Sequence, residues 1–483
     1  GGPFGLTQLV HTAFGALPLA YFGTEEQKTA YLPRMASGAT IAAFALTEPD
    51  VGSDALHIGT TAALAEDGGH YVLNGSKQFT SNSGYASVFI TFAKVDGERF
   101  AAFLLDRSSP GLLLGEEEKK MGIRGSSTRG LTFNDVRVPC GNVLLEPGKG
   151  HLVAFNTLNV GRHRLAAACT GSARVAFEDA LRYARNRRQF ERPIATFGLV
   201  KEKIAEMAIR LFAAESLVYR TAGLLDRELA DAHSLSGPEV ARRISGLALE
   251  CSVSKVYASE MLQHVTDEAV QVHGGYGYLE EYPVERHYRD ARIYRIFGGT
   301  NEINRLIVAK ALHRRAKADE GGLASRVEQR EPSPEGDVPE GLQAAGRLVS
   351  RAKWLAAVAL SSGCEANPAE FGPEEELAAS IARIAIEAYA MESCFLRAWK
   401  IHRRWGASRS EAAVAMSNVY IAGALPVAEV WTEQVLAHAG EAAAVRDEPR
   451  RPAAAPGSRD LDAIRLRRSI ADFFLDVGKY SAC

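Results

Sequence analysis

The sequence predicts a mostly α-helical protein with a central β-domain. Between residues 40 and 140, short stretches of alternating apolar and polar residues are broken by Gly, Asp and Asn, which is typical of strands joined by turns. From about residue 150, apolar residues recur at three- and four-residue spacing, which is typical of amphipathic helices. With 483 residues, the chain is long enough for two or three packed units, each with its own core.

The first 140 residues divide into a helical part and the β-domain. Residues 1–39 are largely apolar and helical in character, and residues 25–34 predict a short helix. The β-domain covers residues 40–140 and includes predicted strands at 87–92 and 100–105. Short strands at such regular spacing form a barrel or a sandwich.

Long helices account for most of the rest of the chain. Residues 141–315 predict amphipathic helices with breaks at 191–193 and 231–238. Residues 316–340 are rich in charge, proline and glycine and poor in aromatic residues, so they predict a linker. The helical period then resumes, and residues 341–483 predict a C-terminal helical domain.

The bulk composition favours a soluble cytoplasmic enzyme. A net charge of −2 provides no basic surface for nucleic acid. The six cysteines are scattered without the paired spacing of metal ligands, so we expect reduced thiols and no metal site. No uninterrupted stretch of about eighteen apolar residues predicts a membrane span, and the N-terminal residues do not resemble a secretory signal.

A second interruption of the helical pattern, at residues 439–459, bears on membrane contact. It contains several arginines, but these are mixed with acidic residues and broken by prolines instead of lying on one apolar helix face. We therefore favour a solvated loop over a membrane-surface contact.

Four ordered motifs carry a specific resemblance. The motifs are ALTEPDVGSD at 45–54, LNGSK at 73–77 with Ser81-Asn82, RNRRQF at 185–190, and QVHGGYGY at 271–278 continuing to 302. Together they resemble the signatures of the acyl-CoA dehydrogenase family, and further stretches at 120–124, 136–139 and 158–162 resemble its very-long-chain branch.

The resemblance refines the expected architecture. It implies a helical bundle, a barrel-like middle β-domain and an additional helical domain at the C-terminus, as found in the very-long-chain branch. Residues 1–39 then correspond to a remnant of the N-terminal helical domain that the family usually carries.

The resemblance also implies FAD as cofactor and a set of residues that bind it. Gly52 lacks a Cβ, so its backbone can approach a diphosphate closely, and the hydroxyl of Ser53 can donate to the phosphate oxygens. Arg187 has a planar, permanently charged guanidinium that pairs well with diphosphate oxygens, and the resemblance places it across a homodimer interface. The full set of implied cofactor residues is Phe44, Leu46, Thr47, Gly52, Ser53, Phe79, Ser81, Arg187, Gln189, Phe190, Gln271, Gly275, Thr300 and Glu302.

The expected catalytic base is missing. In the family, a glutamate in the last motif removes the proton next to a thioester carbonyl while the neighbouring carbon passes hydride to the flavin; here that position is Gly298. Some relatives carry the base on an earlier helix, and the matching position is Gly161. The resemblance implies that Arg162 and Gly299 contact the substrate.

Four other residues are candidates to replace the base. His163 has a suitable unperturbed pKa of about 6.5, but residues two apart in a helix face nearly opposite ways, so it should point away from the direction of position 161. Glu302 falls in a first helical turn, where a capping or dipole role is favoured. Glu280 and Glu281 would reach the substrate only if their loop folded inward.

Three functional interpretations follow. The chain is an FAD-dependent acyl-CoA dehydrogenase homologue with impaired or altered proton abstraction, a flavin oxidase or monooxygenase of the same fold, or a non-catalytic flavoprotein. We favour the first interpretation, with acyl-CoA thioesters as substrates, a homodimer as the assembly and an electron-transfer flavoprotein as the candidate electron acceptor.

Overall fold

The computed structural model describes residues 2–319, 338–367, 369, 371–372, 374–440 and 461–481. The chain divides into two compact units. Unit 1 contains residues 1–165, 223–251 and 297–299, and unit 2 contains residues 166–222, 252–296 and 300–483. The predicted linker at 316–340 and the interruption at 439–459 lie largely outside the described residues.

Unit 1 begins with helices that lead into the strands. The predicted helix at 25–34 is confirmed, and it begins with a capping box in which the Thr24 side chain accepts from the Gln27 backbone and the Gln27 side chain accepts from the Thr24 backbone. The helical elements are α1 (Gly2–Leu9), the π-helical turn η1 (Val10–Ala16), α2 (Leu17–Phe22) and α3 (Glu25–Ala36).

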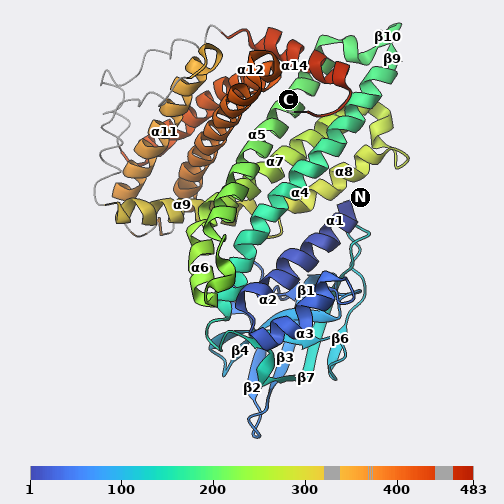
Figure 1. Cartoon of the computed structure of the whole chain (residues 1–483), viewed down its shortest axis with the longest axis vertical. Helices are drawn as coiled ribbons and strands as arrows, with labels where there is room; N and C mark the ends of the chain where they lie inside the picture. Colours follow the sequence, from blue (N-terminus) through green and yellow to red (C-terminus); the bar gives the residue numbers. More distant parts are fainter. Residues whose placement is uncertain are drawn as a thin grey trace. The chain divides into compact units, whose positions relative to one another are not determined.

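The predicted β-domain is also confirmed. Eight strands form one sheet with the hydrogen-bonded order β6-β7-β3-β2-β4-β5-β8, and β1 pairs in parallel with β4 (Figure 1). The strands are β1 (Ala42–Ala45), β2 (Thr61–Leu64), β3 (His70–Ser81), β4 (Val88–Val95), β5 (Arg99–Asp106), β6 (Leu112–Leu114), β7 (Thr128–Pro139) and β8 (Val143–Leu144).

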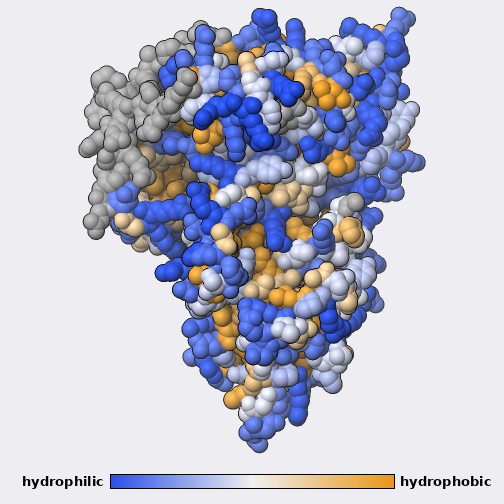
Figure 2. Space-filling view, in the orientation of Figure 1, coloured by the Kyte–Doolittle hydropathy of each residue, from blue (hydrophilic) through white to orange (hydrophobic). Residues whose placement is uncertain are grey.

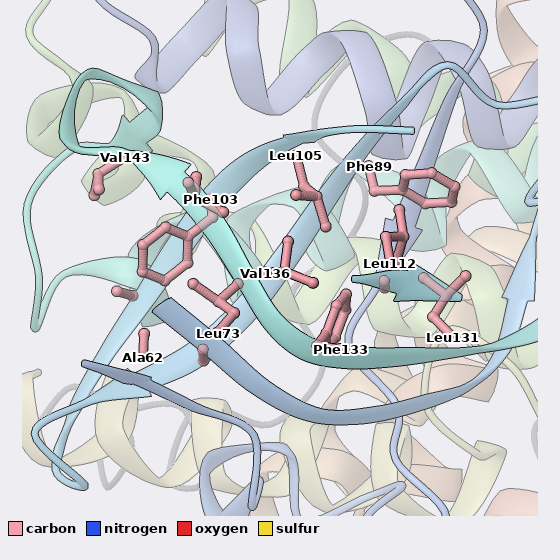
Figure 3. Close-up of a cluster of buried hydrophobic side chains, with 14 of the residues drawn as sticks. Ala62, Leu73, Phe89, Phe103, Leu105, Leu112, Leu131, Phe133, Val136 and Val143 are labelled. Carbon is pink, nitrogen blue, oxygen red and sulfur yellow. The ribbon is translucent and has the colours of Figure 1, made fainter. Parts of the chain in front are cut away.

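Two apolar clusters stabilise this sheet. One lies inside the curved sheet, where Leu73, Phe103 and Val136 from different strands point toward one another (Figure 3). The other joins Leu19 and other residues of the N-terminal helices to apolar residues of β4 and β5. On the face shown in Figure 2, the surface of the strand domain is mostly hydrophilic with scattered apolar residues. The alternation seen in the sequence therefore separates core from surface.

The long amphipathic helices are confirmed as well. The predicted break at 191–193 falls in a hairpin of β9 (Arg188–Gln189) and β10 (Arg192–Pro193), and the break at 231–238 contains a 3₁₀ turn (Ala232–Ser234). The helices are α4 (Gly150–Asn186), α5 (Gly198–Glu228), α6 (Gly237–Gly246), α7 (Ala248–His273), α8 (Pro283–Ala291) and α9 (Asn301–Ala318). Other short 3₁₀ turns are Ala55–His57, Cys140–Asn142, Ile194–Thr196, Gly274–Tyr278 and Arg292–Arg295.

Unit 2 also contains the C-terminal helices α11 (Glu340–Ala366), α12 (Glu375–His438) and α14 (Ala463–Val477). Helix α12 is kinked at Gly406, and α11 lies beside it (Figure 1). Arg397 of α12 pairs with Glu215 of α5 at 3.0 Å. Among the described residues, α12 alone is long and apolar enough to cross a membrane, but a helix buried in a protein core meets the same criterion.

Candidate functional site

Gly298 lies in a tight turn that precedes α9 in the chain. Its φ is +68° and that of Gly299 is +82°, a left-handed backbone conformation that favours glycine. Both residues belong to unit 1. The two consecutive glycines thus allow the chain to turn sharply at the position of the missing base.

Arg162 of α4 holds this turn. Its Nε donates a 3.0 Å hydrogen bond to the carbonyl oxygen of Gly298, and its Nη1 donates a 2.7 Å hydrogen bond to Asn159 Oδ1. The side chain is buried, with 6% of its surface exposed. Burial lowers the pKa of Arg162 to about 10, so the guanidinium stays charged at neutral pH. The predicted substrate residues Arg162 and Gly299 therefore lie near the base position within unit 1.

The space beside Gly298 is bounded by an apolar side chain. An ideal Cβ built on Gly298 would lie 2.7 Å from Leu165 Cδ1, and no other non-neighbouring atom of the chain would lie within 4 Å. A side chain at position 298 would therefore have to displace the end of Leu165, which can rotate more readily than backbone.

The second base position is closed. An ideal Cβ on Gly161 would lie 2.3 Å from Phe14 Cζ, much closer than carbon atoms approach one another. The Phe14 ring itself packs edge-on against Phe44 at a centroid distance of 5.6 Å. Any residue larger than glycine at 161 would thus require Phe14 to move.

His163 is unsuited to proton abstraction in this structure. Burial, reinforced by the positive charge of Arg164, lowers the pKa of His163 to about 4. Its buried Nδ1 has no hydrogen-bond partner within the described part of the chain. At neutral pH the imidazole is uncharged and weakly basic, so a general-base role is disfavoured.

The acidic candidates lie in unit 2. Glu302 occupies the first turn of α9, where Thr300 is the N-cap and its Oγ1 accepts from the Ile303 backbone. The pKa of Glu302 is lowered chiefly by a hydrogen bond with its own backbone, consistent with a capping role. Glu280 and Glu281 are exposed. No group of three His, Cys, Asp or Glu side chains suited to a metal ion occurs among the described residues.

In unit 1, the loop that carries Thr47, Gly52 and Ser53 is fixed by a buried ion pair. Lys77 Nζ donates a 2.7 Å hydrogen bond to Glu48 Oε1, while Glu48 also accepts from the backbone of Gly59 at 2.6 Å. Burial lowers the pKa of Lys77 to about 8, and Glu48 limits that fall. Burial also opposes ionisation of Glu48, but the bonds from Lys77 and Thr60 outweigh it and hold the pKa of Glu48 below its usual value.

This loop lies beside the predicted flavin residues of β3. The Gln78 backbone N–H donates to the Thr47 carbonyl at 2.8 Å, which brings Thr47 next to the segment 78–81. Phe79 has a φ of +55° and is 62% exposed, an unusual state for a phenyl ring in a strand. An ideal Cβ built on Gly52 would have no non-neighbouring atom within 4 Å. Leu46 is buried and Phe44 half-buried between Phe14 and Phe92.

Unit 2 holds a pocket of about 470 Å³ that brings three predicted cofactor residues together: Arg187, Gln189 and Gly275. The Arg187 guanidinium lies over the ring of Tyr276, 5.4 Å from its centroid. The other lining residues are Tyr183, Ile194, Val272, His273, Gly274, Tyr276 and Leu279. A charged guanidinium in a pocket with aromatic walls suits a ligand that carries phosphate and a flat ring.

Two predicted residues near this pocket do not line it. Gln271 is exposed, and Phe190 lies at the tip of the β9–β10 hairpin, 87% exposed. Phe190 and Glu191 both have positive φ, so the glutamate occupies a left-handed position at the turn. The backbone oxygen of Glu191 accepts from the Arg188 guanidinium.

Sequence reasoning missed the ion pair of Glu48 and Lys77 and the role of Phe14. Both members of the pair lie inside motifs that carry the resemblance, so an acid in one motif and a base in the other was a usable signal. Phe14 gave no such signal, because its contact with Gly161 depends on the tertiary fold.

Four sequence models of acyl-CoA dehydrogenase domains match the chain. They are the N-terminal domain at 1–39, the middle domain at 43–136, and two C-terminal domain models at 148–313 and 360–447. Together they cover most of the sequence.

Individual relatives agree with the domain matches. A protein of Bacillus subtilis (strain 168) described as a probable acyl-CoA dehydrogenase is 44% identical over 443 residues, which is 90% of this chain and 75% of that protein. The human mitochondrial very long-chain specific acyl-CoA dehydrogenase is 42% identical over 63% of this chain, and the match spans about half of that protein, 46%.

A solved structure supports the same assignment. The acyl-CoA dehydrogenase of Bacillus anthracis, complexed with FAD, superimposes with a TM-score of 0.92 at 41% identity, over 99% of this chain and 83% of the other. The predicted fold, with its helical bundle, middle β-domain and extra C-terminal helices, is therefore confirmed. On these matches, the chain belongs to the acyl-CoA dehydrogenase family.

Proposed function

We propose that this chain is an FAD-dependent acyl-CoA dehydrogenase homologue that binds acyl-CoA thioesters, with Gly298 in place of the usual catalytic glutamate. The observation that carries the proposal is the turn at Gly298, which Arg162 holds and which offers no side chain to take a proton. Family membership supports the substrate class, and the FAD-bound Bacillus anthracis relative supports the cofactor.

The residues present fit FAD on three structural grounds. The open backbone at Gly52 leaves room for a diphosphate, and the exposed ring of Phe79 offers a stacking surface. The pocket with Arg187 is large enough for part of a nucleotide. Bound there, FAD would supply the hydride acceptor of the reaction.

The pairing of these residues with FAD is a proposal drawn from the family resemblance. Residues of unit 1, from Phe44 to Ser81, would hold the flavin and its diphosphate. Arg187, Gln189, Phe190, Gln271 and Gly275 would hold the FAD of a second subunit, which makes a homodimer the proposed assembly. Thr300 and, in α9, Glu302 are the remaining residues that the resemblance assigns to FAD.

Because the catalytic base is missing, we expect a low rate of dehydrogenation. A well-placed general base contributes about a hundred- to ten-thousand-fold to a reaction rate. Gly298 provides no base, Phe14 closes the position of Gly161, and His163 is a weak base at neutral pH. We therefore expect acyl-CoA binding with slow α,β-dehydrogenation.

Arg162 and Gly299 would position the substrate. By fixing the Gly298 carbonyl, Arg162 orients the peptide groups of the turn, and backbone donors of this kind can polarise a thioester oxygen. We further propose a cytoplasmic location, supported by the five described cysteines, all of which are free. An electron-transfer flavoprotein is the proposed electron acceptor.

Anaerobic mixing of the FAD-loaded protein with a panel of acyl-CoA thioesters tests the function. We expect a perturbed flavin spectrum on binding, followed by slow bleaching of the oxidised flavin. The variant Gly298→Glu should bleach about a hundred-fold faster or more.

The other interpretations give different results in the same experiment. Fast reoxidation of the reduced flavin by O₂ would favour an oxidase or monooxygenase. No spectral change with any acyl-CoA would favour a non-catalytic flavoprotein. Fast bleaching that Gly298→Glu leaves unchanged would show that the base comes from elsewhere.

A further inference from the structure

Arg162 is a buried cation whose hydrogen bonds go to neutral oxygens only. Within the described residues its guanidinium donates to the Gly298 carbonyl at 3.0 Å and to the Asn159 side-chain amide oxygen at 2.7 Å. Neither acceptor carries a charge. A buried charge normally has a partner of opposite sign, because leaving water without one is costly.

Other arginines of the chain have such partners. Arg305 pairs with Glu260, and Arg397, which is less buried than Arg162, pairs with Glu215. Arg351 pairs with Glu429. Arg162 forms no ion pair with any described residue, although it is 6% exposed. Its charge is therefore not balanced by an ion pair within the described chain.

The position of the missing side chain lies beside Arg162, at Gly298. The Gly298 carbonyl is hydrogen-bonded to the guanidinium, so the missing side chain would start within a few bond lengths of the cation. An ideal Cβ there would lie 2.7 Å from the terminal Cδ1 of Leu165, and no other non-neighbouring atom would lie within 4 Å. The cation and a position closed only by one rotatable methyl group thus occur together.

We propose that a small free carboxylate, of the size of formate or acetate, binds beside Gly298 as the counter-ion of Arg162. This rests on the proposed function in one respect only: in that position the bound carboxylate acts as the proton acceptor that the chain lacks. The binding itself requires only the geometry of Arg162, Gly298 and Leu165.

The proposed dehydrogenation needs no reactant beyond the bound carboxylate, the acyl thioester and oxidised FAD. The carboxylate oxygen takes the proton from the α-carbon of the acyl thioester and becomes a carboxylic acid. Bound FAD would supply the acceptor for the hydride that leaves the β-carbon, and a double bond would form between the two carbons. The carboxylic acid then loses its proton to solvent and is regenerated.

Leu165 sets the size of the ligand. Because its Cδ1 lies 2.7 Å from the Cβ position of residue 298, an acid bound at this position has to displace that methyl group, and a longer carbon chain has to displace it further. Formate has no such chain, acetate has one methyl group and propionate has two carbons. Formate and acetate should therefore bind more tightly than propionate, and Leu165→Val should narrow that difference.

Titration of the FAD-loaded protein with sodium formate, acetate and propionate, against sodium chloride at constant ionic strength, tests the site. Melting temperature and flavin difference spectra report binding without turnover. We expect a saturable rise in melting temperature with formate and acetate but not with chloride. At saturation, the anaerobic bleaching rate with acyl-CoA should rise at least tenfold.

Three variants test whether the response to formate and acetate arises at Gly298 and Arg162. Gly298→Ala places a methyl group in the space and keeps Arg162, so it should abolish the saturable response. Arg162→Gln removes the cation and should do the same. Arg164→Gln is the matched control, because Arg164 lies on the same helix and bonds to Thr12 instead of the Gly298 turn; it should respond like the parent.

Each outcome decides a separate point. No saturable effect of formate or acetate, or an equal effect in Gly298→Ala, overturns the site. Saturable binding without faster bleaching supports the site and overturns the proton-acceptor role. If the parent bleaches fast without any carboxylate, the proposed loss of the base is wrong, while the thermal titration still tests binding.

Discussion

The ring of Phe14 occupies the place that a side chain at position 161 would need, with its Cζ 2.3 Å from the ideal Cβ of Gly161. Phe14 also packs against Phe44, which joins the N-terminal helices to strand β1 within unit 1. The glycine at 161 is thus a packing requirement of this chain as well as the absence of a base.

This contact predicts that a base cannot be moved to position 161 by one substitution. Gly161→Glu should be destabilised by about 1–3 kcal/mol or more through overpacking and should gain no dehydrogenase activity. The double variant Phe14→Ala/Gly161→Glu should be faster than Phe14→Ala alone. Unfolding free energies and anaerobic flavin-bleaching rates measure both. A stable, active single variant would contradict the packing argument.

Gly298→Glu should regain activity at a cost in stability. The positive φ of residue 298 disfavours any residue with a Cβ, by about 1 kcal/mol. Gly298→Ala carries the same backbone cost and no carboxylate, so it is the control. The bleaching rate of the Glu variant should exceed that of the Ala variant about a hundred-fold or more. Equal rates would mean that the carboxylate is not acting as a base.

Breaking the buried pair of Lys77 and Glu48 should be strongly destabilising. Lys77→Met leaves a buried carboxylate without its cation, which typically costs about 3–5 kcal/mol. The double variant Lys77→Met/Glu48→Gln should lose less than the sum of the single variants. Lys28→Met, which breaks the more exposed pair with Glu25, is the control and should cost about 1 kcal/mol or less. Chemical denaturation measures all four, and similar losses in Lys77→Met and Lys28→Met would contradict the argument.

The same pair should affect cofactor affinity. Glu48 holds the backbone of Gly59 and Thr60 and so closes the loop that carries Gly52 and Ser53. If that loop binds FAD, Glu48→Gln should weaken FAD binding in a variant that remains folded. The dissociation constant of FAD, measured by flavin fluorescence, checks this. An unchanged constant would separate the pair from the cofactor.

The lowered pKa of Lys77 predicts that the unfolding free energy depends on pH in the alkaline range. Its pKa is about 8 in the folded protein against 10.5 for an ordinary lysine, so between these values the unfolded chain binds more protons than the folded one. The Lys77 contribution to the unfolding free energy should therefore rise with pH from about 8 to 10.5, by about 3 kcal/mol at most. The difference between the parent and Lys77→Met, measured by denaturation at several pH values, isolates this term. A difference that falls over this range would contradict the assignment.

In the acidic range, the unfolding free energy should depend on the ionisation of Glu48. Glu48 has a folded pKa below 4.5, so its stabilising contribution is present above that pH and is lost as the pH falls through the folded value. Below pH 4.5, the difference in unfolding free energy between the parent and Glu48→Gln should become smaller as the pH falls. A difference that persists at the lowest pH at which the protein folds would contradict this.

The helices and strands could be predicted from the sequence because the spacing of apolar residues that marks them is a local property of the chain. The strands at 87–92 and 100–105 became β4 and β5 with nearly the same bounds, and the breaks at 191–193 and 231–238 separate helices as expected. Family motifs also brought Arg187, Gln189 and Gly275 to one pocket. These three residues lie in or next to turns, and the conformation of a turn depends mainly on the residues within it.

The contacts that bound the candidate site could not be predicted in this way. Phe14 reaches Gly161, and Leu165 reaches Gly298, across segments distant in the chain, and neither contact has a local pattern. The buried charge of Arg162 was also hidden, because burial of a single arginine depends on everything packed around it. The assignment of individual residues to FAD remains a prediction.

The stacking of Arg187 on Tyr276 predicts a role for this tyrosine in nucleotide binding. The ring face lies 5.4 Å from the guanidinium carbon and restricts where the charge can point within the pocket. Such a cation–π contact contributes about 0.5–2 kcal/mol. Tyr276→Leu should therefore weaken FAD binding about two- to thirty-fold, whereas Tyr276→Phe, which keeps the ring, should bind nearly as tightly as the parent. Arg187→Ala should be weaker than either, since it removes the charge that would face the diphosphate. Equilibrium dialysis of FAD against the three variants gives the order, and a Phe variant as weak as the Leu variant would show that the hydroxyl, and not the ring face, is what the cofactor site uses.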